Sequence, residues 1–124
     1  MKKAFILIAA LVCISGIAHA QDVYFAGNAD TIGKIWKNDT LIYSISDSIS
    51  IKLNDLQPNH NGTVYTAGYA YDYSQGFVLG RIWTNESCIF TSDTNTFFDH
   101  LVINDEGWTA AGGNTVWHNG ETLY

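Results

Sequence analysis

The chain has 124 residues with 6 basic and 12 acidic side chains, so its formal net charge is −6. Two of the basic residues, Lys2 and Lys3, lie in the first 20 positions, and the remainder keeps 4 basic and 12 acidic residues, a formal charge of −8. A surface this acidic repels phosphate groups, which argues against nucleic acids and anionic membranes as partners.

The first 20 residues have the order of a secretory signal peptide. Residues 1–3 are Met-Lys-Lys, residues 4–17 are predominantly apolar, and residues 18–20 are Ala-His-Ala. The apolar run of 14 residues is shorter than the ~20 that a membrane-spanning helix needs. We therefore expect cleavage after position 20 and export of the remainder to the periplasm or the medium, without a membrane anchor. The alternative, a lipid on Cys13, is less favoured because Val12 stands where that signal has a small residue.

Only one cysteine, Cys88, remains after this cleavage, so an intrachain disulfide cannot form. Small exported domains are often stabilised by disulfides, and this one must rely on packing instead. Cys88 is followed by Ile89 and Phe90, which predicts a buried thiol that packs as a small apolar side chain.

The remainder of the chain contains an internal repeat, and a repeat of this length decides the fold. One block begins with residues typical of strands and ends in Ala-Gly, and its glycines are 41 and 44 residues apart. It occurs at residues 23–27 (Val-Tyr-Phe-Ala-Gly), 64–68 (Val-Tyr-Thr-Ala-Gly) and 108–112 (Trp-Thr-Ala-Ala-Gly). A second block with a tryptophan at its second position follows each copy, at residues 35–39, 82–86 and 116–120.

Two further regularities support the repeat. An aromatic residue stands seven positions after each of these tryptophans, and a hairpin would place both on the same side of the sheet. These aromatic residues are Tyr43, Phe90 and Tyr124. A third block occurs twice, at residues 53–62 and 98–107, and ends in a glycine. In the first copy the glycine belongs to Asn61-Gly62, a pair that predicts a type I′ turn because both central residues of that turn need positive φ.

The units of ~40 to 45 residues predict about four short antiparallel strands each, the size of a propeller blade. Runs rich in Val, Ile, Tyr, Trp and Thr alternate with Gly, Asn and Asp, and helical periodicity is lacking after the first 20 residues. In the first unit the strands are expected near residues 23–26, 33–37, 41–45 and 49–53. The predicted units are residues 22–62, residues 63–107 and an incomplete 108–124. Residues 69–76 are expected to form a longer loop or extended hairpin.

With these blocks the chain resembles exported bacterial repeat proteins of the β-propeller kind, in which a Val-Tyr-x-Ala-Gly strand precedes an Ile-Trp-x-Asn-Gly hairpin. The resemblance covers residues 22–124, although Asp39 and Glu86 replace the glycine that Gly120 retains. It implies an all-β fold of antiparallel blade-like repeats, either a partial β-propeller or an open stack of four-stranded sheets. It implies no particular ligand.

The repeats amount to about two and a half blades, whereas propellers usually close with about four to eight. A closed ring removes the exposed strand edges that an open stack retains. Three interpretations follow. Copies of the chain associate to complete a ring, the chain is a shortened remnant of a longer propeller protein, or it is an open twisted stack.

The recurring tryptophans and asparagines are the candidate ligand-binding residues: Trp36, Trp83, Trp117, Asn38, Asn85 and Asn119. A tryptophan face and an asparagine amide in each unit could bind a sugar between blades. The favoured interpretation is that the tryptophans fill the space between successive sheets, because large flat side chains suit that packing.

No catalytic residues, metal ligands or cofactors are predicted. His60, His100 and His118 lack the repeated spacing to a carboxylate that a metal site would show, and we expect them at the surface. The carboxylates fall in turns, and the repeat contains no single pair that would serve a glycosidase. The sequence therefore predicts a non-catalytic exported protein that binds a partner, whether another copy, a protein or a glycan. The alternative is a lectin formed by ring closure.

Overall fold

The computed structural model describes residues 21–123. The predicted signal peptide, Cys13 and Tyr124 lie outside the described residues. The described part of the chain consists of strands and turns without a helix. The strands are β1 (Tyr24–Ala29), β2 (Ile32–Lys37), β3 (Thr40–Ile45), β4 (Ser50–Pro58), β5 (Val64–Asp72), β6 (Phe77–Thr84), β7 (Ser87–Thr94), β8 (His100–Asn104), β9 (Gly107–Gly112), β10 (Thr115–His118) and β11 (Glu121–Thr122).

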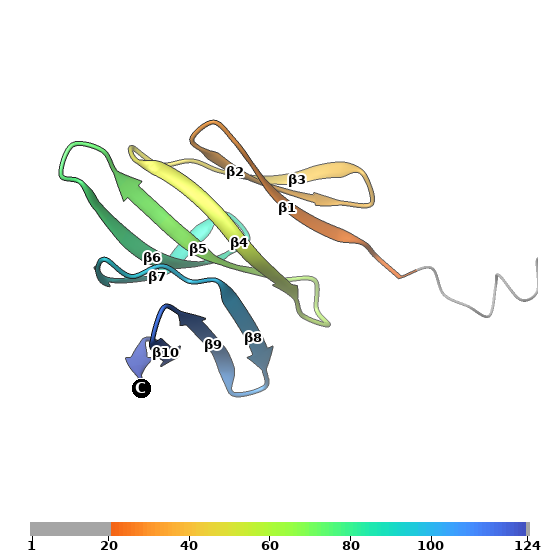
Figure 1. The fold of residues 1–124 in the computed structure, drawn as a ribbon. Helices are drawn as coiled ribbons and strands as arrows, with labels where there is room; N and C mark the ends of the chain where they lie inside the picture. Colours follow the sequence, from red (N-terminus) through yellow and green to blue (C-terminus); the bar gives the residue numbers. More distant parts are fainter. Residues whose placement is uncertain (1–20, 124) are drawn as a thin grey trace, which may run out of the picture.

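These strands form three antiparallel sheets, which we call the first, second and third sheet in chain order (Figure 1). The first contains β1-β2-β3, the second β4-β5-β6-β7 and the third β8-β9-β10-β11, and each strand pairs with its neighbours in the chain. The second sheet lies between the other two (Figure 1). The prediction of an all-β fold of antiparallel repeats is confirmed, and the sheets form an open stack in the described residues.

The sheets are offset from the predicted repeat units by one strand. β4 lies at the end of the predicted unit 22–62, yet it pairs with β5 of the next unit. β8 likewise lies at the end of unit 63–107 and pairs with β9. The links after β3 and β7 therefore carry the chain from one sheet to the next, and the three-stranded sheet is the first one.

The tight hairpins after β2, β6 and β10 each begin with an asparagine in the left-handed region. Asn38 has a φ of 49°, Asn85 of 53° and Asn119 of 49°. Asp39 follows with a φ of 68° and Gly120 with 92°, so both of these turns have the two positive φ values of type I′. The aspartate thus takes the place of the glycine without changing the turn type, since Asp is among the residues that tolerate this conformation.

The pair Asn61-Gly62 does not form the predicted type I′ turn, because only Gly62 has a positive φ, of 90°. The loop is wider and spans residues 59–63 between β4 and β5. The side-chain Oδ1 of Asn59 accepts hydrogen bonds from the backbone N–H groups of Asn61 (3.2 Å) and Thr63 (3.0 Å). These side-chain bonds stabilise the longer loop and remove the need for a two-residue turn.

Two apolar layers separate the three sheets. Between the first and second sheets lie Ile35, Ile45, Ile51, Leu53, Val64 and Trp83. Between the second and third lie Ala67, Ile82, Phe98, Leu101, Trp108, Ala110 and Trp117. On β6, Ile82 faces the following sheet and Trp83 faces the preceding one, because neighbouring residues of a strand point to opposite faces.

A bulge in the β2–β3 hairpin changes which side chains share a face. Trp36 pairs with Leu41, but Ile35 pairs with Tyr43, so Ile42 is an extra residue without a partner. The same irregularity occurs in the β6–β7 hairpin. A single inserted residue reverses the side to which the following residues point.

The bulges overturn the expectation that each tryptophan shares a layer with the aromatic residue seven positions later. Phe90 lies instead against the third sheet, with ring centroids 5.3 Å from Trp108 and 5.5 Å from Trp117. Tyr43 packs in the layer that contains Trp83. Phe90 therefore contacts the tryptophan of the next unit, and Tyr43 packs in the layer that contains it, which joins these consecutive repeats.

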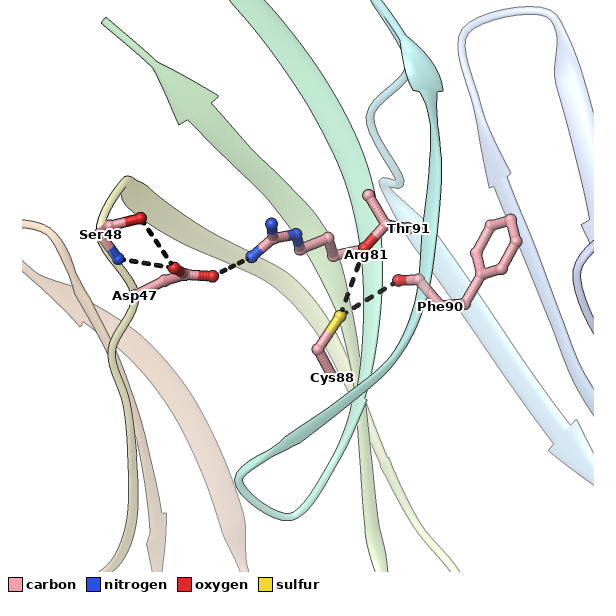
Figure 2. A network of polar contacts seen from close by, with 6 residues as sticks. All are labelled: Asp47, Ser48, Arg81, Cys88, Phe90 and Thr91. Carbon is pink, nitrogen blue, oxygen red and sulfur yellow. Dashed lines mark hydrogen bonds and ion pairs between the residues drawn. The ribbon is translucent and has the colours of Figure 1, made fainter.

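A polar contact also joins the sheets (Figure 2). The guanidinium of Arg81, on β6, forms an ion pair with Asp47, which lies in the link between β3 and β4. The Asp47 carboxylate also accepts a hydrogen bond from the backbone N–H of Ser48 at 2.6 Å. The bond from Arg81 and the bond from Ser48 hold the pKa of Asp47 below its usual value.

The prediction that Cys88 is buried is wrong. Its side chain is exposed on β7, and the thiol donates a hydrogen bond to the carbonyl oxygen of Phe90 at 3.4 Å (Figure 2). β7 is the outer edge strand of the second sheet. Position on an edge strand leaves the thiol in solvent even though Cys88 pairs across the strands with the buried Trp83.

Candidate functional site

The three candidate asparagines hold the hairpins together. In each unit the side-chain Oδ1 accepts the backbone N–H of the residue that opens the repeat, and the backbone N–H of the asparagine donates to the carbonyl of that same residue. The side-chain bonds are Asn38 to Val23 (2.9 Å), Asn85 to Val64 (3.0 Å) and Asn119 to Trp108 (2.9 Å). The backbone bonds measure 2.9, 2.8 and 3.1 Å. This repeated contact accounts for an asparagine at these positions without a ligand.

Two of the three candidate tryptophans fill the layers between sheets. Trp83 is 1% exposed and Trp117 is 9% exposed, and each faces the sheet that precedes its own. A ligand could reach them only if the sheets separated. Trp36 occupies the same position in the first sheet, where no described residue covers it, and it remains half-buried.

Trp36 belongs to an apolar surface on the first sheet, which we call the open face and define as Val23, Phe25, Trp36 and Leu41. Val23 is 66% exposed, Phe25 62% and Leu41 45%. Trp36 pairs across the strands with Phe25 and with Leu41, and its ring centroid is 5.4 Å from that of Phe25. The four side chains therefore form one continuous patch rather than scattered exposed residues.

Asn38 and Asp39 form a polar rim at one end of the open face, and a network of charged side chains adjoins it. Asp22 and Lys37 make an ion pair at 3.2 Å, and the amide of Asn38 donates to Asp22 at 2.8 Å. The hydrogen bonds from Asn38 and Lys37 lower the pKa of Asp22. A hollow of about 570 Å³ lies beside this rim, lined by Val23, Phe25, Trp36, Asn38 and Asp39. The arrangement has an apolar centre and a polar rim, as protein interfaces do.

A second candidate site is a groove of about 690 Å³ beside the far half of β5, which we call the tyrosine groove. It is lined by Ser50, Lys52, Asn54, Tyr69, Tyr71, Tyr73, Val78, Phe97 and Asp99. β5 is nine residues long and β9 only six, so the end of the β5–β6 hairpin extends past the third sheet. The groove offers aromatic faces beside an amine, an amide and a carboxylate.

The sequence contained a signal for this groove. Tyr69, Tyr71 and Tyr73 alternate in the segment expected to be an extended hairpin, and alternation on a strand places side chains on one face. Tyr69 contacts Phe97 edge-on, with centroids 6.3 Å apart, and Phe97 comes from the link between β7 and β8. That second contribution depends on the path of the chain between sheets, which the pattern of residues does not show.

The histidines do not gather into a site. His60 and His100 are exposed, and the Nδ1 of His118 lies 3.0 Å from the hydroxyl of Thr109. Among residues 21–123, the structure has no group of three or more His, Cys, Asp or Glu side chains placed to hold a metal ion.

Comparison with known proteins finds no significant match to a protein family, to a curated protein or to a solved structure. In the part of the chain that the structure describes, no helix has the length and apolar character needed to cross a membrane.

Proposed function

We propose that the chain is an exported, non-catalytic interaction module that binds a protein partner through the open face of its first sheet. The observation that carries this proposal is the contrast between equivalent repeat positions. Val64 and Trp83 of the second sheet are 0% and 1% exposed, whereas their counterparts in the first sheet, Val23 and Trp36, are exposed and half-buried. The first sheet presents to solvent the surface that its neighbours use to pack.

The exposed apolar area of the open face limits how strongly it can bind a partner. Complete burial of a valine, leucine or phenylalanine stabilises by about 1.5–3 kcal/mol. Burial of the remaining exposed parts of Val23, Phe25 and Leu41 therefore contributes roughly 3–5 kcal/mol in total. Association costs an estimated 4–15 kcal/mol in lost translational and rotational freedom. The apolar patch needs further contacts from its partner, and a protein supplies them more readily than a small molecule does.

The test is photo-crosslinking in the producing cell. The chain is expressed with a photoreactive phenylalanine analogue in place of Phe25, irradiated, and its adducts are identified by mass spectrometry. The same analogue in place of Tyr73, which is 75% exposed at the end of the β5–β6 hairpin, is the matched control. The proposal predicts a defined protein adduct from position 25 that position 73 does not form. Equal or absent adducts at both positions would contradict it.

Another copy of the chain is one protein that could serve as this partner, as the ring-closure interpretation requires. Light scattering of the purified chain measures its mass and separates a defined oligomer from a monomer. In an oligomer held by the open face, replacement of Phe25 by serine is expected to yield monomers.

Carbohydrate binding is the alternative function, and the tyrosine groove is the observation that favours it. Aromatic faces and hydrogen-bonding groups in one shallow groove suit a sugar ring and its hydroxyls. The chain is screened on a glycan array together with a Tyr71→Ala variant. Binding of a glycan that the variant loses would support this alternative. No tryptophan lines the tyrosine groove, so tryptophan emission is not a direct probe of binding there.

A further inference from the structure

We call the edge formed by the N-terminal strand of each sheet, β1, β4 or β8, its inner edge. The inner edge of the first sheet differs from that of the other two. In the second sheet β5 pairs with β4 on its inner side, and in the third β9 pairs with β8. β1 is the counterpart of β5 and β9, and among the described residues its only paired neighbour is β2. The inner side of β1 therefore presents unpaired backbone groups, which are able to pair with an added strand.

The glycine that ends the Val-Tyr-x-Ala-Gly block shows how the inner strand is accommodated. A Cβ atom at Gly68 would lie 1.9 Å from the backbone oxygen of Lys52, and one at Gly112 would lie 1.5 Å from that of Phe97. Only glycine permits the inner segment to pass this close. Gly27, the counterpart on β1, has no backbone atom among its nearest neighbours, which are side-chain atoms of Trp36 and Phe25. The first sheet thus has the glycine for a close backbone approach without the approaching segment.

The inner segments of the second and third sheets also share a pattern of apolar residues. Leu53 pairs with Gly68, and Leu56, three residues later, pairs with Thr66. In the third sheet Phe98 lies beside Gly112, where a Cβ atom would be 3.1 Å from the Phe98 Cα, and Leu101, three residues later, pairs with Ala110. These four side chains all lie in the apolar layers. A segment of this type on β1 would place its first apolar residue beside Gly27 and its leucine beside Phe25.

We propose that the inner edge of β1 binds an extended segment of a partner polypeptide, with a leucine or phenylalanine beside Gly27 and a leucine three residues later beside Phe25. The new strand forms main-chain hydrogen bonds with β1, and its two apolar side chains extend the open face. The inference rests on the proposed function and identifies the form of the partner. It supplies the contacts that the apolar patch alone lacks.

The inner segments of the second and third sheets are the template for the added strand, so the probe is a peptide with the sequence of β4. A fluorescently labelled peptide with the sequence of residues 50–58, Ser-Ile-Lys-Leu-Asn-Asp-Leu-Gln-Pro, is titrated with the purified full-length gene product after export. Fluorescence anisotropy measures binding, and hydrogen exchange measures protection of the β1 amides. The control peptide carries serine in place of both leucines.

Saturable binding and new protection confined to β1 are expected, with an affinity at least tenfold lower for the control peptide. The Gly27→Val variant is expected to lose at least tenfold in affinity, since its side chain meets the backbone of the peptide. A Phe25→Ser variant, at an exposed position, tests the same contact if Gly27→Val destabilises the fold. Val102→Ser removes an equally exposed apolar residue on β8, 62% exposed like Phe25, and is expected to leave binding unchanged.

Several results would overturn the inference. One is the absence of saturable binding, and another is binding that neither Gly27→Val nor Phe25→Ser weakens. A dimer that the peptide does not dissociate would show that a second copy covers the edge. A purified chain that binds the peptide only after residues 1–20 are removed would assign the edge to that segment. If crosslinks form from position 25 while the peptide fails, the proposed function stands and only the strand addition is wrong.

Discussion

The hydrogen bond from the side chain of Asn85 to the backbone of Val64 allows a quantitative test of the repeated asparagine. Three replacements separate its two roles. Asp keeps an acceptor oxygen, Gly keeps the left-handed backbone without the acceptor, and Ala loses the acceptor and also strains the backbone at a φ of 53°. We therefore expect the stability order Asp above Gly above Ala.

The magnitude follows from the burial of Val64, which is 0% exposed. Without the acceptor its N–H is buried and unpaired, and such a group costs about 1–3 kcal/mol. Alanine in the left-handed region adds about 1–2 kcal/mol. We expect Asn85→Gly to lower the free energy of unfolding by about 1–3 kcal/mol and Asn85→Ala by about 2–5 kcal/mol.

Asn38 is the internal control, because it makes the same bond to Val23, which is 66% exposed. Water can replace the lost acceptor there, so Asn38→Gly is expected to cost about 0.5–1 kcal/mol. Urea unfolding followed by circular dichroism measures both series. Equal losses for Asn38→Gly and Asn85→Gly would refute the argument that burial of the N–H determines the cost.

Three further predictions concern the ion pair, the tryptophans and the thiol. Asp47→Asn is expected to destabilise by about 1 kcal/mol, a modest value because the carboxylate is 37% exposed and screened by solvent. The folded pKa of Asp47 is lowered from 3.8, so this contribution is present above that value and is lost as the pH falls through the folded pKa. Urea unfolding of both proteins from pH 7 to pH 3 measures it, and a constant difference at all pH values would contradict it. Trp83→Ala is expected to cost about 3–5 kcal/mol, and Trp36→Ala less than half as much, in thermal unfolding. The exposed Cys88 is expected to react with a thiol reagent in the native protein, and a reaction that requires denaturant would show that the thiol is covered.

Much of the fold followed from local patterns. The all-β class and the first three strands of the first unit depend on strand-forming runs between turn residues, and these preferences act over a few neighbouring residues. The packing of Trp83 and Trp117 between sheets followed from their recurrence once per unit, since a repeated unit must bury its apolar face against the next.

The candidate site was less predictable. The sequence suggests the asparagines as ligand-binding groups, whereas each accepts a hydrogen bond from a backbone N–H 11 to 21 residues away in sequence. The tyrosine groove needs Phe97 from the link between sheets, and the open face exists because no sheet precedes the first one among the described residues. These features depend on which segments meet in space.

The sequence by itself determined the repeat, the strand-forming segments and the residue types that alternate between faces, because those are properties of the chain over short distances. The tertiary structure decided which sheet each strand joins and which layer each aromatic residue enters. One extra residue in a hairpin, Ile42 or Ile89, reverses the side to which Tyr43 or Phe90 points, and only strand pairing reveals it. The exposure of Trp36 follows from the lack of a covering sheet among the described residues, and that of Cys88 from its place on the edge strand β7.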